Sequence, residues 1–330
     1  MVAPVGSGLV SGRVLILGAA GMIGRKLLER LSREGHFTDL VLHDVVPAGK
    51  NSLASDLSAP GEAEKLIALR PELIFHLAAI VSGEAEADFE KGYRVNLDGT
   101  RLLFEAIRKV GHGYRPRVVF ASSIAVFGAP FPEAIADDFL CAPLTSYGTQ
   151  KAIGELLVAD YSRRGFMDGI GLRLPTICVR PGKPNKAASG FFSGIIREPL
   201  AGREALLPVP ETVRHWFASP RAAVGFLLHA ARMDTTRLGN RRNLSMPGVS
   251  ASVGEQIEAL RKVAGEGAVR LIRREPDASI QRIVSGWPQN FDAKRALSFG
   301  FRADASFEEI IRIHLQDELA GTALPQPGRA

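Results

Sequence analysis

Short apolar runs alternate with amphipathic stretches from Arg13 onward. The apolar runs that predict buried strands cover residues 13–18, 40–44, 73–77, 117–121 and 171–174. The stretches with helical spacing of apolar positions cover residues 22–34, a short segment starting near 61, 89–110 and 146–164. This alternation predicts an α/β fold, with a doubly wound parallel sheet and crossover helices.

The pattern changes after Pro175. Proline and glycine cluster over residues 180–185, which predicts a loop, and helical spacing then returns over residues 190–200, 220–232, 253–263 and 306–319. We therefore expect a main domain over residues 13–175 and a smaller C-terminal α/β lobe, mainly for substrate, over residues 176–320. A strand at residues 240–245 could return to the main sheet. Residues 1–12 are expected to form a flexible leader and residues 321–330 a disordered tail.

Composition narrows the class of protein. Of the 330 residues, 46% are hydrophobic and 23% charged, as in an ordinary globular protein. The net charge of +6 is scattered along the chain, which argues against nucleic-acid binding. No apolar run approaches the ~20 residues that cross a membrane, and no signal peptide is recognisable. Cys141 and Cys178 form no metal-binding or disulfide pattern, so we expect apolar filling roles, no metal site and a cytoplasmic location.

A glycine-rich turn joins the first predicted strand to the first predicted helix. Its glycines are Gly18, Gly21 and Gly24, with Met22 and Ile23 between the last two. Glycine lets the backbone approach a pyrophosphate closely, and a helix N-terminus offers free N–H groups and a positive dipole end. The strand before it and the helix after it favour a Rossmann-type dinucleotide site over a simple surface turn.

Asp44 ends the second predicted strand. A carboxylate there can accept hydrogen bonds from both ribose hydroxyls and would repel the 2′-phosphate of NADP, so the expected cofactor is NAD. Asp56 and Leu57 could meet the adenine, although Asp56 could equally cap a turn. The small side chains of residues 77–79 (Leu77, Ala78 and Ala79) could admit a dinucleotide or only pack in the core.

Tyr147 and Lys151 are four residues apart in a predicted helix. Such spacing places them on one face with about 6 Å of rise between them. An ammonium near the positive nicotinamide would lower the pKa of the phenol from about 10, toward the pH at which it exchanges a proton with an alcohol. In isolation this pair could also be a surface pair.

Ser122 and Ser123 follow the predicted strand at residues 117–121, at the edge where α/β sheets bind ligands. A hydroxyl at that edge could hold a substrate oxygen while Tyr147 moves the proton. The two serines could instead cap a turn. The order of glycine turn, serines and Tyr147/Lys151 along the chain favours the catalytic interpretation.

These motifs together resemble the extended short-chain dehydrogenase/reductase family over about residues 13–320. The resemblance implies hydride transfer to NAD with Ser123, Tyr147 and Lys151 as the catalytic group. It also implies that Asn96 supports Lys151, that the segment containing Pro175 and Ile177 crosses beside the cofactor, and that a homodimer forms through helices near 95–110 and 147–164. Phe127 departs from the Tyr that is usual in sugar-nucleotide epimerases of the family.

Within the family, residues 77–87, 180–190 and 213–216 resemble dehydrogenases that oxidise a four-carbon sugar acid at its 2-hydroxyl. A sugar-acid carboxylate needs a cation. The C-terminal lobe offers several, and the expected substrate contacts comprise Ser82, Ser122, Ser123, Tyr147, Lys183, Arg214 and His215, with Arg180 and Lys186 as further cations. Each cation could instead be solvated, His215 could be packed beside Trp216, and Ser82 could only turn the chain.

Three functions remain open from the sequence. The first is a sugar-acid dehydrogenase, and the second is a sugar-nucleotide epimerase or dehydratase, or a threonine-type dehydrogenase, with the same motifs. Ile124 and Ala125 stand where a dehydratase usually carries acidic residues. The third is a non-catalytic NAD sensor, which would tend to lose the tyrosine or the lysine that this chain keeps.

Overall fold

A seven-stranded parallel sheet forms the centre of the computed structural model, which describes residues 12–35, 39–49, 52–182 and 189–320. The expected leader lies outside these residues except for its last residue, Gly12. The expected tail and Lys183 also lie outside them. From one edge to the other, the strands are β11 (Asn243–Ser245), β7 (Asp168–Leu174), β5 (Arg117–Ser123), β4 (Leu73–His76), β1 (Val14–Leu17), β2 (Leu40–Asp44) and β3 (Leu53–Ala54). All neighbouring pairs are parallel, which confirms the predicted fold class.

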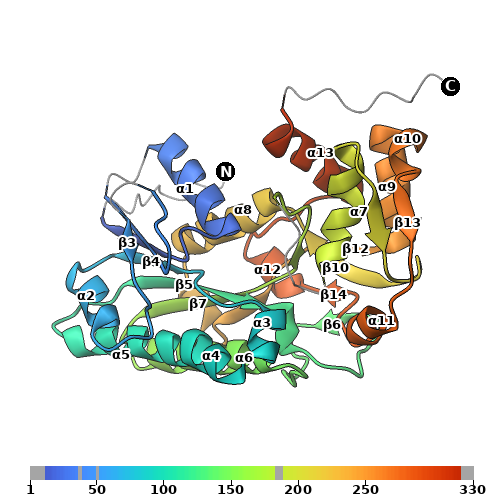
Figure 1. Cartoon of the computed structure of the whole chain (residues 1–330). Helices are drawn as coiled ribbons and strands as arrows, with labels where there is room; N and C mark the ends of the chain where they lie inside the picture. Colours follow the sequence, from blue (N-terminus) through green and yellow to red (C-terminus); the bar gives the residue numbers. More distant parts are fainter. Residues whose placement is uncertain (1–11, 36–38, 50–51, 183–188, 321–330) are drawn as a thin grey trace, which may run out of the picture.

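Helices cover both faces of this sheet (Figure 1). The helices on one face are α1 (Met22–Glu34) and α8 (Pro220–Arg232), and those on the other are α2 (Glu62–Ala68), α5 (Gly99–Val110) and α6 (Ser146–Arg163). Strand β1 shows why its run is apolar throughout. Val14 and Ile16 belong to the core under α1 and α8, whereas Leu15 and Leu17 belong to the opposite core. A strand buried on both faces needs no polar alternation.

The predicted helix over residues 89–110 consists of three parts. The helix α4 (Phe89–Gly92) continues into a π-helical stretch, η1 (Tyr93–Asp98), and then into α5. The wider turns of a π-helix often occur at functional sites. The sequence analysis predicts the extent of this segment but not its π-helical part, which carries Asn96.

The smaller lobe packs around its own apolar core. Its helices and strands lie beside the main sheet (Figure 1). Its strands are β6 (Ile135–Ala136), β8 (Thr176–Ile177), β9 (Ala205–Leu207), β10 (Arg214–Ala218), β12 (Val249–Ser252), β13 (Ile272–Arg274) and β14 (Phe291–Asp292). Its main helices are α7 (Gly190–Leu200), α9 (Val253–Ala264), α10 (Glu266–Val269), α11 (Ala278–Ser285) and α13 (Phe307–Glu318). In the three-stranded sheet, β10 lies between β8 and β12.

The chain returns to the main domain more extensively than the sequence analysis predicts. Besides β11, helix α8 packs against β5 and β7, and its apolar residues share a core with α1. Ala296 in α12 (Lys294–Ser298) and Phe301 after it join the same core. Amphipathic spacing marks α8 as a helix but does not say which lobe buries its apolar face, so the expected assignment of that helix to the smaller lobe is corrected.

Among the helices of the described ranges, none combines the length and the apolar character that crossing a membrane requires.

Candidate active site

The glycine turn lies at the carboxyl end of β1. Gly18 has a φ of +86°, and a Cβ there would lie 2.7 Å from the Ala78 nitrogen, so only glycine fits without displacing the backbone after β4. A Cβ on Gly24 would lie 2.2 Å from the Gly18 carbonyl oxygen. These contacts explain two of the three glycines by close packing of strand, turn and helix.

The N-terminus of α1 suits an anionic ligand. Gly21 precedes the helix, no side chain caps it, and its first turn contains no acidic residue. Met22 and Ile23 are half-buried in that turn. Backbone N–H groups at a helix start need partners, and the glycine leaves room for a phosphate to supply them. The turn therefore fits the pyrophosphate of a dinucleotide.

Asp44 lies beside this turn at the end of β2. Its Oδ2 accepts a hydrogen bond from the Ala20 N–H at 2.9 Å, and its Oδ1 accepts one from the Val45 N–H at 2.7 Å. Each carboxylate oxygen has more than one acceptor position, so both can still accept a ribose hydroxyl. The backbone contacts hold the carboxylate in place next to the turn.

Asp56 adopts the turn alternative. It accepts hydrogen bonds from the Ser58 N–H at 2.9 Å and the Ser58 hydroxyl at 2.6 Å, and it pairs with Arg94. Partial burial raises the pKa of Asp56. The hydrogen bonds from Ser58 and Arg94 together lower it by more, so the pKa lies below its usual value. Leu57 is buried in the core. Cofactor contacts by both residues stay predictions.

The segment after β4 lies between the glycine turn and the serines. Since β4 is hydrogen-bonded to both β1 and β5, residues 77–79 emerge at the centre of the carboxyl edge. Leu77, Ala78 and Ala79 are half-buried there, with small side chains at two of the three positions. This edge can accommodate an extended ligand running from β1 toward β5.

Ser122 and Ser123 point to different surroundings, as successive strand residues must. Ser122 is buried, and its hydroxyl donates to Glu155 Oε1 at 2.5 Å. Glu155 also forms a bidentate ion pair with Arg173. Ser122 is thus bound into a buried polar cluster beneath α6, and its predicted substrate contact is corrected.

Ser123 is the last residue of β5 and meets the Tyr147 side chain. Its Oγ accepts a hydrogen bond from the Ala125 N–H at 3.1 Å, which fixes the short turn η2 (Ile124–Val126). The Ser123 side chain also lies near the Tyr147 phenol and lowers its pKa. Two hydroxyls that could share one substrate oxygen are therefore brought together by β5 and the first turn of α6.

Lys151 is buried with its ammonium under the end of β5. Its Nζ donates to the Ala121 carbonyl oxygen at 2.8 Å and lies 4.8 Å from the Phe120 ring centroid and 5.7 Å from the Tyr147 ring centroid. Burial lowers the pKa of Lys151 to about 8, against an opposing effect of Glu155. The ammonium is close to the tyrosine ring but bonded to the strand.

The pKa of Tyr147 differs from the sequence-based expectation. Burial raises it, and the groups that oppose this effect are the Ser123 side chain and the positive charge of Arg180. The Lys151 ammonium is directed to the Ala121 carbonyl, and its predicted lowering of the Tyr147 pKa beside a bound nicotinamide stays a prediction. The sequence analysis names Arg180 only as one of several cations, and spacing alone gives no sign of its proximity to Tyr147.

Asn96 is buried in η1 and connects the loop after β4 to helix α6 rather than contacting Lys151 directly. Its Oδ1 accepts from the Ile80 N–H at 2.9 Å, while its Nδ2 donates to the Ile80 carbonyl at 3.1 Å and to Gln150 Oε1 at 2.8 Å. Gln150 neighbours Lys151 on α6. Asn96 thus ties the segment after β4 to the helix that carries the catalytic candidates. Gln150 has no recognisable sequence signal.

The remaining predicted residues are divided among several places. Pro175 and Ile177 are buried where the chain leaves β7, and Ile177 pairs with Ala218 across β8 and β10. Ser82 begins α3 (Ser82–Ala87) and is half-buried, so its substrate contact stays a prediction.

His215 is a packed histidine. It is 3% exposed, its ring stacks on Phe192 at 5.4 Å, and its nitrogens contact Thr176 Oγ1 and the Pro288 carbonyl, both at 2.7 Å. Burial lowers its pKa to about 4, so the ring is neutral near pH 7. With both nitrogens occupied, His215 follows the packed alternative and not the predicted substrate contact.

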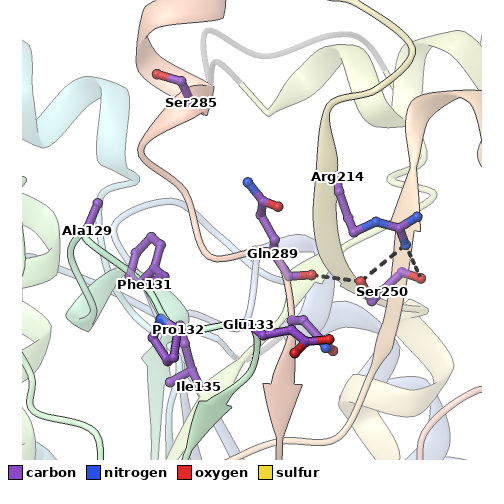
Figure 2. A pocket seen from close by; sticks show the side chains of 10 residues that line it. Ala129, Phe131, Pro132, Glu133, Ile135, Arg214, Ser250, Ser285 and Gln289 are labelled. Carbon is purple, nitrogen blue, oxygen red and sulfur yellow. Dashed lines mark hydrogen bonds between the residues drawn. The ribbon is translucent and has the colours of Figure 1, made fainter.

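Arg214 faces the other side of β10, toward a separate pocket (Figure 2). Its Nη2 pairs with Glu255 Oε2 at 2.9 Å, and its Nη1 lies 3.4 Å from the Ser250 hydroxyl, which donates to the Gln289 carbonyl. The pocket is also lined by the loop at residues 129–135 and contains none of Ser123, Tyr147 and Lys151. Arg214 thus has an acidic partner, Glu255, and its predicted contact with the substrate stays a prediction.

Comparison with known proteins places this geometry in a family. Residues 14–238 match the NAD dependent epimerase/dehydratase family. The chain is 48% identical to a D-erythronate dehydrogenase of Cupriavidus necator, over 92% of this chain and 98% of that protein. It is 42% identical to a D-erythronate dehydrogenase of Haemophilus influenzae, over 93% and 100%.

The chain belongs to the NAD dependent epimerase/dehydratase family. This result confirms the predicted resemblance and the cofactor NAD, and it identifies an NAD-dependent dehydrogenase that acts on a CH–OH group. A crystal structure named the nucleoside-diphosphate-sugar epimerase from Agrobacterium tumefaciens is 63% identical, with a TM-score of 0.91 and coverage of 97% of this chain and 98% of that chain. The L-threonine dehydrogenase of Cupriavidus necator, at 23% identity and a TM-score of 0.82, shares the fold.

We predict that Asp44→Ala reduces the preference for NAD over NADP at least about tenfold, equivalent to about 1.4 kcal/mol. The change removes the carboxylate that would repel a 2′-phosphate. Steady-state kcat/KM with each cofactor measures the ratio. Asp39→Ala is the control, since Asp39 is an exposed carboxylate paired with Arg13. An unchanged ratio in the Asp44 variant would mean that the ribose is recognised elsewhere.

We predict that Lys151→Met stabilises the cofactor-free chain at pH 7 while abolishing catalysis. The pKa of Lys151 falls from 10.5 to about 8 on folding, so the unfolded chain binds more protons between these values. The wild type therefore gains stability as pH rises from about 8 to about 10.5. Removing the buried charge stabilises the variant, and losing the hydrogen bond to Ala121 offsets part of that gain. At pH 7 the variant should therefore be more stable than the wild type by roughly 2 kcal/mol, and this difference should disappear above about pH 10.

Urea denaturation at pH 7 and pH 10 measures this difference. Lys65→Met, at an exposed lysine, is the control and should change stability little at either pH. A Lys151 variant less stable than the wild type at pH 7 would contradict the assignment of a costly buried charge.

Proposed function

We propose that this chain oxidises the 2-hydroxyl of D-erythronate to 2-oxo-erythronate with NAD. The observation that supports the proposal is that Ser123 and Tyr147 lie near each other beside buried Lys151, at the same sheet edge as the glycine turn and Asp44. The D-erythronate dehydrogenases at 48% and 42% identity support the substrate, since each aligns over nearly its whole length.

In this proposal the side chains divide the proton chemistry. Ser123 holds the substrate hydroxyl, and Tyr147 accepts its proton as general base. Lys151 supplies positive charge beside the phenol ring, which favours the ionised form of Tyr147. NAD, when bound, supplies the acceptor for the hydride that leaves the same carbon. The substrate thus loses one proton and one hydride and becomes a ketone.

A second candidate is a sugar-nucleotide epimerase. The Agrobacterium structure that carries such a name is 63% identical to this chain, and epimerases of the family share the same motifs. An epimerase returns the hydride to its product, so NAD undergoes no net turnover. Phe127, which packs against Phe139 and Phe291, departs from the tyrosine usual in those epimerases and favours the dehydrogenase.

We predict that D-erythronate produces NADH in an absorbance screen of four- to six-carbon aldonates, L-threonine and UDP-sugars.

Tyr147→Phe should reduce kcat by a factor of about 100 or more with NAD affinity nearly unchanged, because only the proton-transfer group is removed. Phe166→Leu, at a ring distant from the active site, provides a matched aromatic control. A response to UDP-sugars without one to aldonates would reject the substrate, and full activity of the Tyr147 variant would reject the mechanism.

We further propose a cytoplasmic homodimer in which α5, α6 and their symmetry mates form a four-helix interface. Leu156 on α6 is 70% exposed and Phe89 on the neighbouring α4 is 59% exposed. Burial of these apolar side chains against a second copy of the chain would stabilise the dimer. Cys141 and Cys178 are both free thiols, which suits a reducing compartment.

We predict that Leu156→Arg shifts the chain toward the monomer in size-exclusion chromatography with light scattering. Burial of a charge at the centre of a helical interface opposes association. Leu206→Arg, at an exposed leucine in the smaller lobe, is the control and should leave the oligomeric state unchanged. A monomeric wild type at micromolar concentration would reject the dimer.

A further inference from the structure

Arg180 is held next to the active site by contacts that, among the residues the structure describes, use only part of its guanidinium. Its backbone N–H donates to Ser193 Oγ at 3.0 Å, and its carbonyl accepts from Arg197 Nη1 at 2.8 Å. Its Nε donates to the Ile177 carbonyl at 3.1 Å. Backbone and side chain are thus fixed by β8 and α7, so the charge has a defined position.

The charge of Arg180 has no acidic partner among the described residues. A guanidinium carries five N–H donors. One is used by Ile177 and one makes a long contact of 3.4 Å with Ser189 Oγ, while the other three have no partner in the described part of the chain. By contrast, Arg173 and Arg197 pair with Glu155 and Glu198.

Within the described ranges, the titratable groups near Arg180 do not neutralise it. Arg197, which bonds to its carbonyl, is itself a cation, and the others are Tyr147, Cys178 and His215. Burial raises the pKa of Cys178 to about 12 and raises that of Tyr147, while it lowers that of His215 to about 4, so all three are neutral near pH 7. A partly buried cation in neutral surroundings is costly, and an anionic ligand would compensate it.

The position of the charge indicates which anion. Strand β7 ends beside the active site, because Leu174 pairs with Ser123, and the Ile177 carbonyl that holds Arg180 lies three residues further along the chain. The charge of Arg180 also acts on the Tyr147 phenol, where the proposed proton transfer takes place. In a 2-hydroxy acid, the carboxylate is bonded to the carbon that carries the reacting hydroxyl. A substrate whose hydroxyl meets Tyr147 therefore carries its negative charge within a few bonds of that phenol. A guanidinium nearby can bind such a carboxylate with two parallel hydrogen bonds.

We propose that Arg180 binds the substrate carboxylate and thereby selects a small 2-hydroxy acid. The proposal rests on the proposed function and assigns the carboxylate-binding role to one of the cations of the C-terminal lobe. Arg214 is not assigned this role, because it already pairs with Glu255. It also lies on the opposite face of β10 from His215. His215 is excluded because both ring nitrogens are occupied.

The test compares Arg180→Gln, Arg180→Lys and the control Arg214→Gln with D-erythronate and with its neutral amide, D-erythronamide. In Arg180→Gln, kcat/KM for D-erythronate should fall about 100-fold or more, because one partner of a desolvated ion pair is lost. Activity with the amide should fall much less, so the acid-to-amide ratio collapses. Arg180→Lys should retain an intermediate ratio, and Arg214→Gln should keep the wild-type ratio. The Kd for NAD should stay within about twofold in every variant.

The outcomes separate the possible failures. A wild type that oxidises D-erythronate while Arg180→Gln keeps its acid-to-amide ratio overturns the assignment and leaves the proposed function intact. An equal loss with acid and amide would show that Arg180 only tunes Tyr147, and would also overturn it. A wild type that binds UDP-sugars through Arg180 but neither binds nor oxidises aldonates rejects the proposed function itself. If Arg180→Gln fails to fold, as judged by circular dichroism, the ratio in Arg180→Lys decides.

Discussion

A positive charge buried under the end of β5 constrains the active site more than any other interaction. The Lys151 ammonium needs a partner in the interior, and the nearest is the Ala121 carbonyl. That bond fixes the first turns of α6 against β5 and so sets where Tyr147 stands relative to Ser123. The buried charge of Lys151 reduces the stability of the folded chain. Such a cost is expected at a functional site, where a cation is needed beside the Tyr147 phenol.

Around this charge lies a second buried polar cluster. Glu155, one turn further along α6, receives hydrogen bonds from Ser122 on β5 and Arg173 on β7. Since Glu155 opposes the lowering of the Lys151 pKa, the cluster both attaches the helix to two strands and keeps the ammonium charged. A mutation in it would therefore alter positioning and protonation together.

Local patterns in the sequence predict the structural features that depend only on residues close together in the chain. The bounds of α1 and β2 follow from apolar spacing and agree with the structure, and the glycine turn follows from its place between them. The side on which a polar residue lies is harder to predict. Ser122 and Ser123, like Arg214 and His215, are adjacent in strands, so one of each pair must face away from the other. Only the packing of α6 and β10 decides which, and the proximity of Arg180 to Tyr147 depends on the join between two lobes.

The repeated return of the chain to the main sheet has a consequence for how such enzymes can diversify. After β8, which belongs to the smaller lobe, the chain supplies α8, β11 and Ala296 to the core of the nucleotide-binding half. Neither half is a continuous stretch that could be cut out or exchanged whole with that of a relative. New specificity is more readily acquired by changing single side chains at the seam than by recombining modules, and the segment after β8 lies on that seam.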